Sequence, residues 1–294
     1  MSSIFQDLKQ QYKVGDMATK LIFWNSFLFI VPSLIAVVLY LVNIPFDYKD
    51  YVAVPSLWSL FVLKPWTLVS YSFFHNSVLH LIFNMMMLHF SGRLFTTFFT
   101  QKQLFGLYFL GGLFGGLLFL LGYQSIPSLQ GQSTALIGAS ASVMAILVAT
   151  TVYQPDYNLR LLFFGNVKLW HVALVFLILD VIQLPFDNTG GHIAHLGGAL
   201  FGFVYIQFLK SGIDLTSGLN SFLDTLMSLF SKKKTTPFKK VHRNVKPKSQ
   251  PSGSRIVTKD KTQQQIDEIL DKISQSGYDS LTKEEKEFLF KAGK

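Results

Sequence analysis

The chain has 294 residues, of which 50% are hydrophobic and only 15% are charged, and its mean hydropathy is +0.36. Soluble domains carry about 25% charged residues, so this composition indicates an integral membrane protein. The absence of cysteine excludes disulfides and thiolate metal sites. A net charge of +9 also occurs in nucleic-acid-binding proteins, but in so apolar a chain it is more typical of a surface that faces anionic lipid.

The charged residues are concentrated toward the C-terminal end. Residues 21–211 carry 7 Lys/Arg and 5 Asp/Glu, whereas residues 212–294 carry 16 Lys/Arg and 10 Asp/Glu. The sequence therefore predicts an apolar block followed by a basic tail. The first apolar run begins near Leu21, is about 22 residues long and lacks a small-residue cleavage site. We expect it to be a retained membrane span and not a cleaved signal peptide.

Six segments are long and apolar enough to be membrane helices, which need about 20 mostly apolar residues. They are residues 21–42, 77–99, 103–122, 133–153, 167–184 and 191–210. The third segment is rich in glycine, and the sixth contains Gly198 and Gly202 at a spacing that lets neighbouring helices approach closely. The sequence predicts an all-α, six-transmembrane-helix bundle over residues 21–210, preceded by a cytoplasmic N-terminal segment, residues 1–20.

Basic residues gather on one side of this six-span arrangement. They are Lys9, Lys13, Lys20, Arg93, Lys102, Arg160, Lys168, Lys232, Lys233 and Lys234. The positive-inside rule then places both termini in the cytoplasm, which an even number of spans also requires. With no targeting segment in the sequence, we expect the membrane to be a bacterial cytoplasmic (inner) membrane.

Polar groups occur in three of the predicted spans at a similar depth. His80 and Asn84 lie in the second span, Ser140 follows Gly138 in the fourth, and His195 lies near the start of the sixth. These three spans run in the same direction. At about 1.5 Å per residue, the four polar side chains lie within about 5–10 Å of the outer boundary. Ionisable and polar groups inside spans are costly, so their convergence predicts a functional site.

Each polar cluster alone has an ordinary explanation. A single serine in a membrane helix usually bonds its own backbone, and a histidine near the end of a span is commonly an interfacial residue. Together they supply a serine nucleophile, an imidazole base and donors for an oxyanion. Gly138 and Gly198 would let the fourth and sixth helices close until Ser140 and His195 touch. Asp180 in the fifth span is expected to pack or to form a hydrogen bond.

In this order, the polar clusters resemble the rhomboid family of intramembrane serine proteases. The motifs are His80-x-x-x-Asn84, Gly138-x-Ser140 and Ala194-His195-x-x-Gly198-x-x-x-Gly202. The resemblance covers about residues 65–207. It implies a dyad with Ser140 as nucleophile and His195 as general base. It also implies an oxyanion site formed by His80, Asn84 and the Ser140 N–H, with no cofactor and no metal.

The family's substrates imply the partners of this chain. They are membrane-anchored proteins whose single spanning helix is cleaved near the outer boundary, within the lipid bilayer. No nucleic acid is expected as a partner, and the sequence does not determine the oligomeric state. One departure concerns the residue after the nucleophile, which is Ala141 where the family commonly has glycine. A second hydroxyl, that of Ser142, is expected on another face of the helix.

The tail contains three predicted parts. Residues 213–230 have apolar side chains at helical spacing, which predicts a helix lying on the inner membrane surface or packed on the bundle. Within an interfacial and linker region, 211–261, residues 231–261 are rich in Lys, Ser and Pro, which favours a disordered linker attracted by anionic lipid. Residues 262–294 predict a small cytoplasmic helical hairpin, with a capping box from Thr282 to Glu285.

Two other functions compete with proteolysis. A non-catalytic rhomboid-like protein would bind or escort membrane proteins, but such relatives usually lack the serine or the histidine, and this chain has both. A transporter is expected to show repeated halves and more charge at mid-membrane, which this sequence does not. An intramembrane metalloprotease is disfavoured, because the sequence contains no His-Glu-x-x-His motif.

Overall fold

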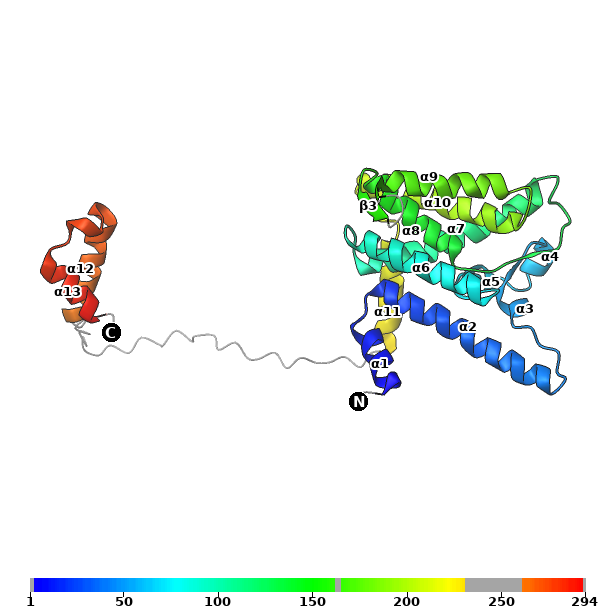
Figure 1. Ribbon diagram of the computed structural model, residues 1–294, viewed down its shortest axis with the longest axis horizontal. Helices are drawn as coiled ribbons and strands as arrows, with labels where there is room; N and C mark the ends of the chain where they lie inside the picture. Colours follow the sequence, from blue (N-terminus) through cyan, green and yellow to red (C-terminus); the bar gives the residue numbers. More distant parts are fainter. Residues whose placement is uncertain (1–2, 162–164, 231–260, 293–294) are drawn as a thin grey trace, which may run out of the picture. The chain divides into compact units, whose positions relative to one another are not determined.

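The computed structural model describes residues 3–161, 165–230 and 261–292, and it divides into two compact units, Met1–Lys233 and Lys234–Lys294. The first unit is built mainly from helices (Figure 1). Its longer helices are α1 (Ile4–Val14), α2 (Met17–Leu41), α6 (Val78–Thr96), α7 (Gln101–Ser125), α8 (Ser140–Tyr153), α9 (Leu169–Gln183), α10 (Thr189–Lys210) and α11 (Ser217–Phe230).

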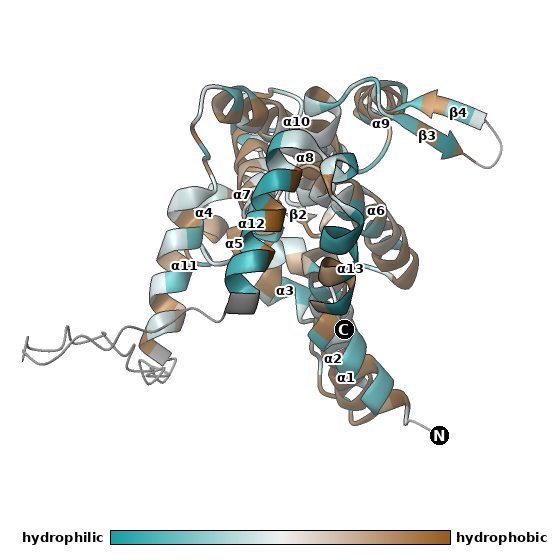
Figure 2. Ribbon diagram, turned by 90° about the vertical axis from the view of Figure 1, so that its left-hand side faces the viewer, coloured by the Kyte–Doolittle hydropathy of each residue, from teal (hydrophilic) through white to brown (hydrophobic). Residues whose placement is uncertain are grey.

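Short elements fill the connections between these helices. Between α2 and α6 lie α3 (Lys49–Val52), β1 (Val54–Pro55), α4 (Trp58–Phe61), α5 (Thr67–Ser70) and the 3₁₀ helix η1 (Tyr71–Phe73). Strand β2 (Ala135–Leu136) precedes α8, and strands β3 (Asn158–Leu161) and β4 (Gly165–Lys168) precede α9. The β3–β4 hairpin, which the sequence analysis did not predict, projects beyond the start of α9 (Figure 2).

Each of the six predicted spans coincides with a helix. Among the described residues, α2, α6, α7 and α10 are long and apolar enough to cross a membrane. Helices α8 and α9 are apolar but have only 14 and 15 residues. The all-α membrane fold with a helical C-terminal tail is therefore confirmed, whereas the count of six spans stays a prediction.

The start of the fourth predicted helix was wrong. Its span was expected over residues 133–153 with Ser140 about seven residues inside, but α8 begins at Ser140 itself. The residues before it are extended, because Ala135 and Leu136 pair with β1 in an antiparallel ladder. Gly138 then adopts a φ of +135°, which side-chain-bearing residues rarely adopt and which is incompatible with an α-helix.

Helix α8 occupies the centre of the first unit. It contacts α6, α7, α9 and α10, and its residues from Ala141 to Thr151 are all buried. An apolar helix that is covered on every side needs no polar face, which agrees with its nearly uniform apolar sequence. The position of α8 fixes Ser140 at the end of the bundle where α6 and α10 also begin.

Small residues allow α10 to lie directly against α8. A Cβ added at Gly198 would collide with the backbone carbonyl of Ala141, and one at Gly202 would collide with that of Ala145. The two helix backbones are therefore in contact over one turn, which is the arrangement that the glycine spacing predicted. On the other side of α8, Gly111 of α7 makes room for the methyl group of Ala145.

Helix α2 is attached to the bundle by its first turns only. Its buried residues are Ala18, Leu21 and Asn25, and the helix diverges from its neighbours toward its C-terminal end (Figure 1). The exposed remainder is apolar: Phe27, Ile30, Leu34, Val38 and Leu41 are each at least half exposed. In a membrane this surface faces lipid chains, which require no polar partner.

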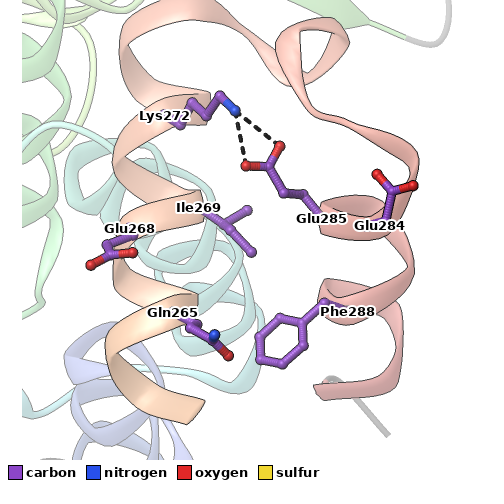
Figure 3. A pocket seen from close by; sticks show the side chains of 7 residues that line it. All are labelled: Gln265, Glu268, Ile269, Lys272, Glu284, Glu285 and Phe288. Atoms are coloured by element: carbon purple, nitrogen blue, oxygen red, sulfur yellow. Dashed lines mark hydrogen bonds and ion pairs between the residues drawn. The ribbon is translucent and has the colours of Figure 1, made fainter. Parts of the chain in front are cut away.

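The second unit contains α12 (Lys261–Ser276), the 3₁₀ helix η2 (Tyr278–Ser280) and α13 (Lys283–Ala292). Ile269 of α12 and Phe288 of α13 face each other across the space between the two helices (Figure 3). Lys272 Nζ contacts both carboxylate oxygens of Glu285, at 2.9 and 3.0 Å. Glu285 also closes the capping box, since it accepts from the Thr282 N–H at 2.8 Å. Nearly all of the predicted basic linker, at 231–260, lies outside the described residues.

Candidate active site

Ser140 and His195 are in direct hydrogen-bond contact. Ser140 Oγ, on the first residue of α8, lies 2.6 Å from His195 Nε2, in the second turn of α10. Both side chains are partly exposed, so the pair is accessible from one end of the bundle. The contact depends on the close approach of the two helices at Gly198, which is one turn after His195.

Asp180 lies behind His195 and holds its other ring nitrogen. This carboxylate is in the last turn of α9 and is only 6% exposed, and its Oδ1 lies 2.8 Å from Nδ1 of His195. A carboxylate accepts from an N–H, so the bond favours the tautomer with the proton on Nδ1. Nε2 then has a free lone pair that faces the hydroxyl of Ser140, as a general base requires.

The same carboxylate oxygen also holds a second histidine. His192 Nδ1 lies 2.8 Å from Asp180 Oδ1, and its side chain is nearly as buried as the carboxylate. Two histidines and an aspartate are also ligand types for zinc, but two ligand atoms on a tetrahedral zinc, with bonds of about 2.0–2.2 Å, would be separated by about 3.3–3.6 Å. The 2.8 Å separations are hydrogen-bond distances, and one carboxylate shared by two N–H donors accounts for the cluster.

His80 lies beside the turn that precedes the serine. A Cβ added at Gly138 would lie 2.7 Å from His80 Nε2 and 3.7 Å from Ser140 Oγ, so the imidazole and the hydroxyl flank the same glycine. The Gly138 N–H donates to the Tyr71 carbonyl at 3.0 Å, which fixes this turn against η1. The glycine therefore both turns the chain into α8 and leaves space for the His80 ring.

Asn84 lies one turn after His80 and is buried, with 6% of its surface exposed. Its Nδ2 donates to the His80 carbonyl within α6 at 2.9 Å, and no hydrogen bond joins it to Ser140 among the described residues. The amide retains a second N–H that is available as a donor. The first N–H groups of α8, beginning with that of Ser140, also have no acceptor within their own helix.

Sequence reasoning missed two histidines and the full role of one carboxylate. His192 precedes His195 by one helical turn, a spacing that places both on one face and was visible in the sequence. His75 is fully buried five residues before His80, and its ring lies 5.2 Å from that of His80. Burial, with a smaller contribution from His80, lowers the pKa of His75 to about 3, so its ring is neutral near pH 7.

A family model described as a Rhomboid domain matches residues 63–211, which is half of the chain and includes all of these side chains. The chain belongs to the rhomboid family. A second model, a family of unknown function (DUF6576), matches residues 257–291, which contain the C-terminal hairpin of this rhomboid protein.

Two curated relatives are similar to part of the chain. RHOMBOID-like protein 12, mitochondrial, of Arabidopsis thaliana is 30% identical over 157 residues, which are 50% of this chain and 47% of the relative. Presenilin-associated rhomboid-like protein A, mitochondrial, of Danio rerio is 30% identical over 140 residues, which are 47% of this chain and 36% of the relative. The chain thus aligns with less than half of the length of each relative.

The departure at Ala141 is accommodated within this rhomboid fold. A Cβ added at Gly115 of α7 would lie 2.6 Å from the Ala141 methyl group, so the methyl group occupies space that this glycine leaves open. It does not separate α8 from α10, because Gly198 meets the Ala141 carbonyl and not its side chain. Ser142 faces Gly112 of α7, away from His195.

Proposed function

We propose that the chain is an intramembrane serine endopeptidase, which cleaves the spanning segments of membrane-anchored proteins near the outer leaflet. The observation that carries the proposal is the 2.6 Å separation between Ser140 Oγ and His195 Nε2. Membership of the rhomboid family supports it, since rhomboid proteins are generally intramembrane proteases. A serine beside a histidine with a free Nε2 is the arrangement that nucleophilic catalysis requires.

The reaction follows from the positions of these groups. His195 Nε2 takes the proton of the Ser140 hydroxyl as Oγ attacks the scissile carbonyl carbon. The carbonyl oxygen becomes an oxyanion. The N-terminal N–H groups of α8, the His80 side chain and the second N–H of the Asn84 amide stabilise it by hydrogen bonds. The imidazolium then gives its proton to the leaving nitrogen as the C–N bond breaks. Water, activated by the same imidazole, hydrolyses the acyl-serine and restores the hydroxyl.

Asp180 is proposed as the residue that positions His195. Its carboxylate fixes the ring orientation and the tautomer, and its negative charge favours the imidazolium that forms when Ser140 loses its proton. The family resemblance implied a dyad of serine and histidine only. The 2.8 Å bond from His195 Nδ1 supports a third participant in this chain.

The location within the cell is also a proposal. The chain is a membrane protein, and we propose a bacterial cytoplasmic membrane with both termini in the cytoplasm. The distribution of lysine and arginine supports this orientation. The two curated relatives carry the word mitochondrial in their names. Reporter fusions in a bacterial host, one at the C-terminus and one near Gln130, are expected to report opposite sides of the membrane, and reports from the same side would refute the orientation.

The direct test of activity is cleavage of a model single-span protein by the purified chain in lipid vesicles. Wild type is expected to produce two fragments, whereas Ser140→Ala and His195→Ala lose about 10³-fold or more in rate. Ser142→Ala, which changes a neighbouring hydroxyl that faces α7, is the matched control. Undiminished cleavage by Ser140→Ala would refute the proposal. Tight capture of the substrate by wild type without any cleavage would indicate a non-catalytic rhomboid-like binder.

A further inference from the structure

A groove of about 720 Å³ lies in the first unit, between α1, α2, the start of α7 and α11. It is at the end of the bundle opposite to Ser140, because α2 and α7 begin there while α8 and α10 end there. The Met17 N–H donates to Gln101 Oε1 at 2.6 Å, which keeps the starts of α2 and α7 level with each other. Since both helices are long enough to cross a membrane, the groove lies where they leave it.

The rim of the groove carries uncompensated positive charge. Lys9, Lys13 and Lys20 line it, and none of them has an acidic partner among the described residues. A fourth lysine, Lys102, is neutralised by Asp224, which its Nζ contacts at 2.6 Å across the space between α7 and α11. Three like charges around one groove repel one another, and an anionic occupant would relieve this repulsion.

The wall of the groove is apolar. Trp24 and Phe105 meet edge to face with their ring centroids 6.1 Å apart, and Trp24 Nε1 donates to the Tyr12 hydroxyl at 3.1 Å. Met227 of α11 completes the wall and is 70% exposed. Lysines around an apolar wall at the membrane surface match an amphiphile with a negative headgroup and a hydrocarbon chain.

We propose that this groove binds an anionic phospholipid. Its phosphate would contact Lys9, Lys13 and Lys20, and one acyl chain would run along the aromatic wall toward the lipid-facing surface of α2. This site is distinct from the basic linker at 231–260, where attraction to anionic lipid was expected from the sequence. An acidic protein segment would satisfy the lysines but would leave the apolar wall without a matching occupant.

The test is thermal unfolding of the full chain in neutral detergent with added phosphatidylglycerol or phosphatidylcholine. We expect phosphatidylglycerol alone to raise the unfolding temperature. The triple variant Lys9→Gln/Lys13→Gln/Lys20→Gln is expected to bind it about 100-fold more weakly. The control Lys64→Gln/Lys168→Gln/Lys210→Gln removes the same charge from residues that do not line the groove, and it is expected to keep the shift. Equal shifts with both lipids, or loss of the shift only in the control, would overturn the proposal.

Two further arms identify the occupant. Inorganic phosphate is expected to cause no shift, and a shift equal to that of the lipid would point to a phosphate site and overturn the lipid assignment. Met227→Glu places a negative charge on the apolar wall and is expected to weaken phosphatidylglycerol binding. Its control is Phe222→Glu, an exposed apolar residue on the same helix that does not line the groove. Equal weakening by both variants would show that α11 contacts lipid without a defined site.

Discussion

Ser140 and His195 are 55 residues apart in the chain, and their side chains meet at the end of the bundle. The sequence predicted this pair because both residues are polar and lie near the same ends of apolar segments. For Asp180 it predicted packing or a hydrogen bond, but it did not identify His195 as the partner. Helix α9 is apolar on nearly every face, so hydropathy does not determine which face turns toward α10. Packing decides it, and the buried stripe of α9 is formed by Leu169, Ala173 and Asp180.

The proposed role of Asp180 predicts the behaviour of Asp180→Asn. The amide keeps the size of the carboxylate but loses its charge, and it can no longer favour the imidazolium of His195. We expect kcat to fall between about tenfold and about 10,000-fold with little change in KM, because substrate binding does not involve this group. The measurement is steady-state cleavage of a single-span substrate.

The control is Asp187→Asn, in the exposed connection before α10, which is expected to cleave at the wild-type rate. Thermal unfolding of Asp180→Asn separates a positioning role from a structural one, since its folded state should persist at the assay temperature. A wild-type kcat for Asp180→Asn would show that His195 is oriented without the carboxylate.

At the scale of elements, the sequence predicted where the helices lie along the chain, but it placed the start of the fourth helix, α8, too early. Residues 133–139 are apolar enough to extend the predicted span, but hydropathy indicates an apolar environment and not the backbone conformation. The pairing of β2 with β1, 80 residues earlier in the chain, is a tertiary contact that no local pattern indicates. The β3–β4 hairpin was missed because the alternation in β3 covers only four residues, and β4 shows none.

The contact between α8 and α10 predicts a large effect of Gly198→Ala. The added methyl group would meet the Ala141 carbonyl, which belongs to a helix backbone and cannot move aside alone. We expect the helices to separate, with a loss of about 1–3 kcal/mol in stability and a larger loss of cleavage as His195 moves away from Ser140. Thermal unfolding and cleavage rate are the two measurements.

The matched control for this substitution is Gly218→Ala on α11, where nothing lies within 4 Å of the added Cβ. Alanine favours a helix over glycine, so Gly218→Ala should be neutral or slightly stabilising. If Gly198→Ala retained wild-type stability and activity, the close approach of the two helices would not be needed for the site.

The start of α2 predicts a dependence of stability on pH. Partial burial raises the pKa of Asp16, but the Thr19 hydrogen bonds and the charge of Arg93 outweigh burial, so the pKa lies below its ordinary value of 3.8. A carboxyl group whose pKa is lower in the folded state than in the unfolded state stabilises the fold at pH values above the unfolded pKa. This contribution is lost as the pH falls through the folded pKa. Asp16→Ala is therefore expected to cost about 1 kcal/mol near pH 7 and less below about pH 4.

The check is thermal unfolding of Asp16→Ala and wild type at neutral and acidic pH. Asp7→Ala on α1 is the control, because Asp7 is exposed and its carboxylate forms no hydrogen bond among the described residues. A difference between Asp16→Ala and wild type that stays constant with pH would show that the carboxylate charge does not stabilise the helix start.

At the scale of the whole molecule, the site and its supporting helices lie within the unit Met1–Lys233. The second unit contributes no residue to the site among the parts of the chain that the structure describes. A chain that ends after Lys233 is therefore expected to keep its unfolding temperature within about 2 °C and to retain cleavage, because every contact around Ser140 remains. Loss of cleavage by the shortened chain with an unchanged unfolding temperature would assign the tail a direct role in catalysis.

The central claim is that His195 activates Ser140 as a nucleophile, and covalent labelling tests it most directly. The full chain in lipid vesicles is treated with a serine-reactive fluorophosphonate, and the modified residue is identified by mass spectrometry. Wild type is expected to be labelled at Ser140, the control Ser142→Ala is expected to be labelled there equally, and His195→Ala is expected to be unlabelled. Absence of labelling in wild type, or equal labelling of His195→Ala, would contradict the account.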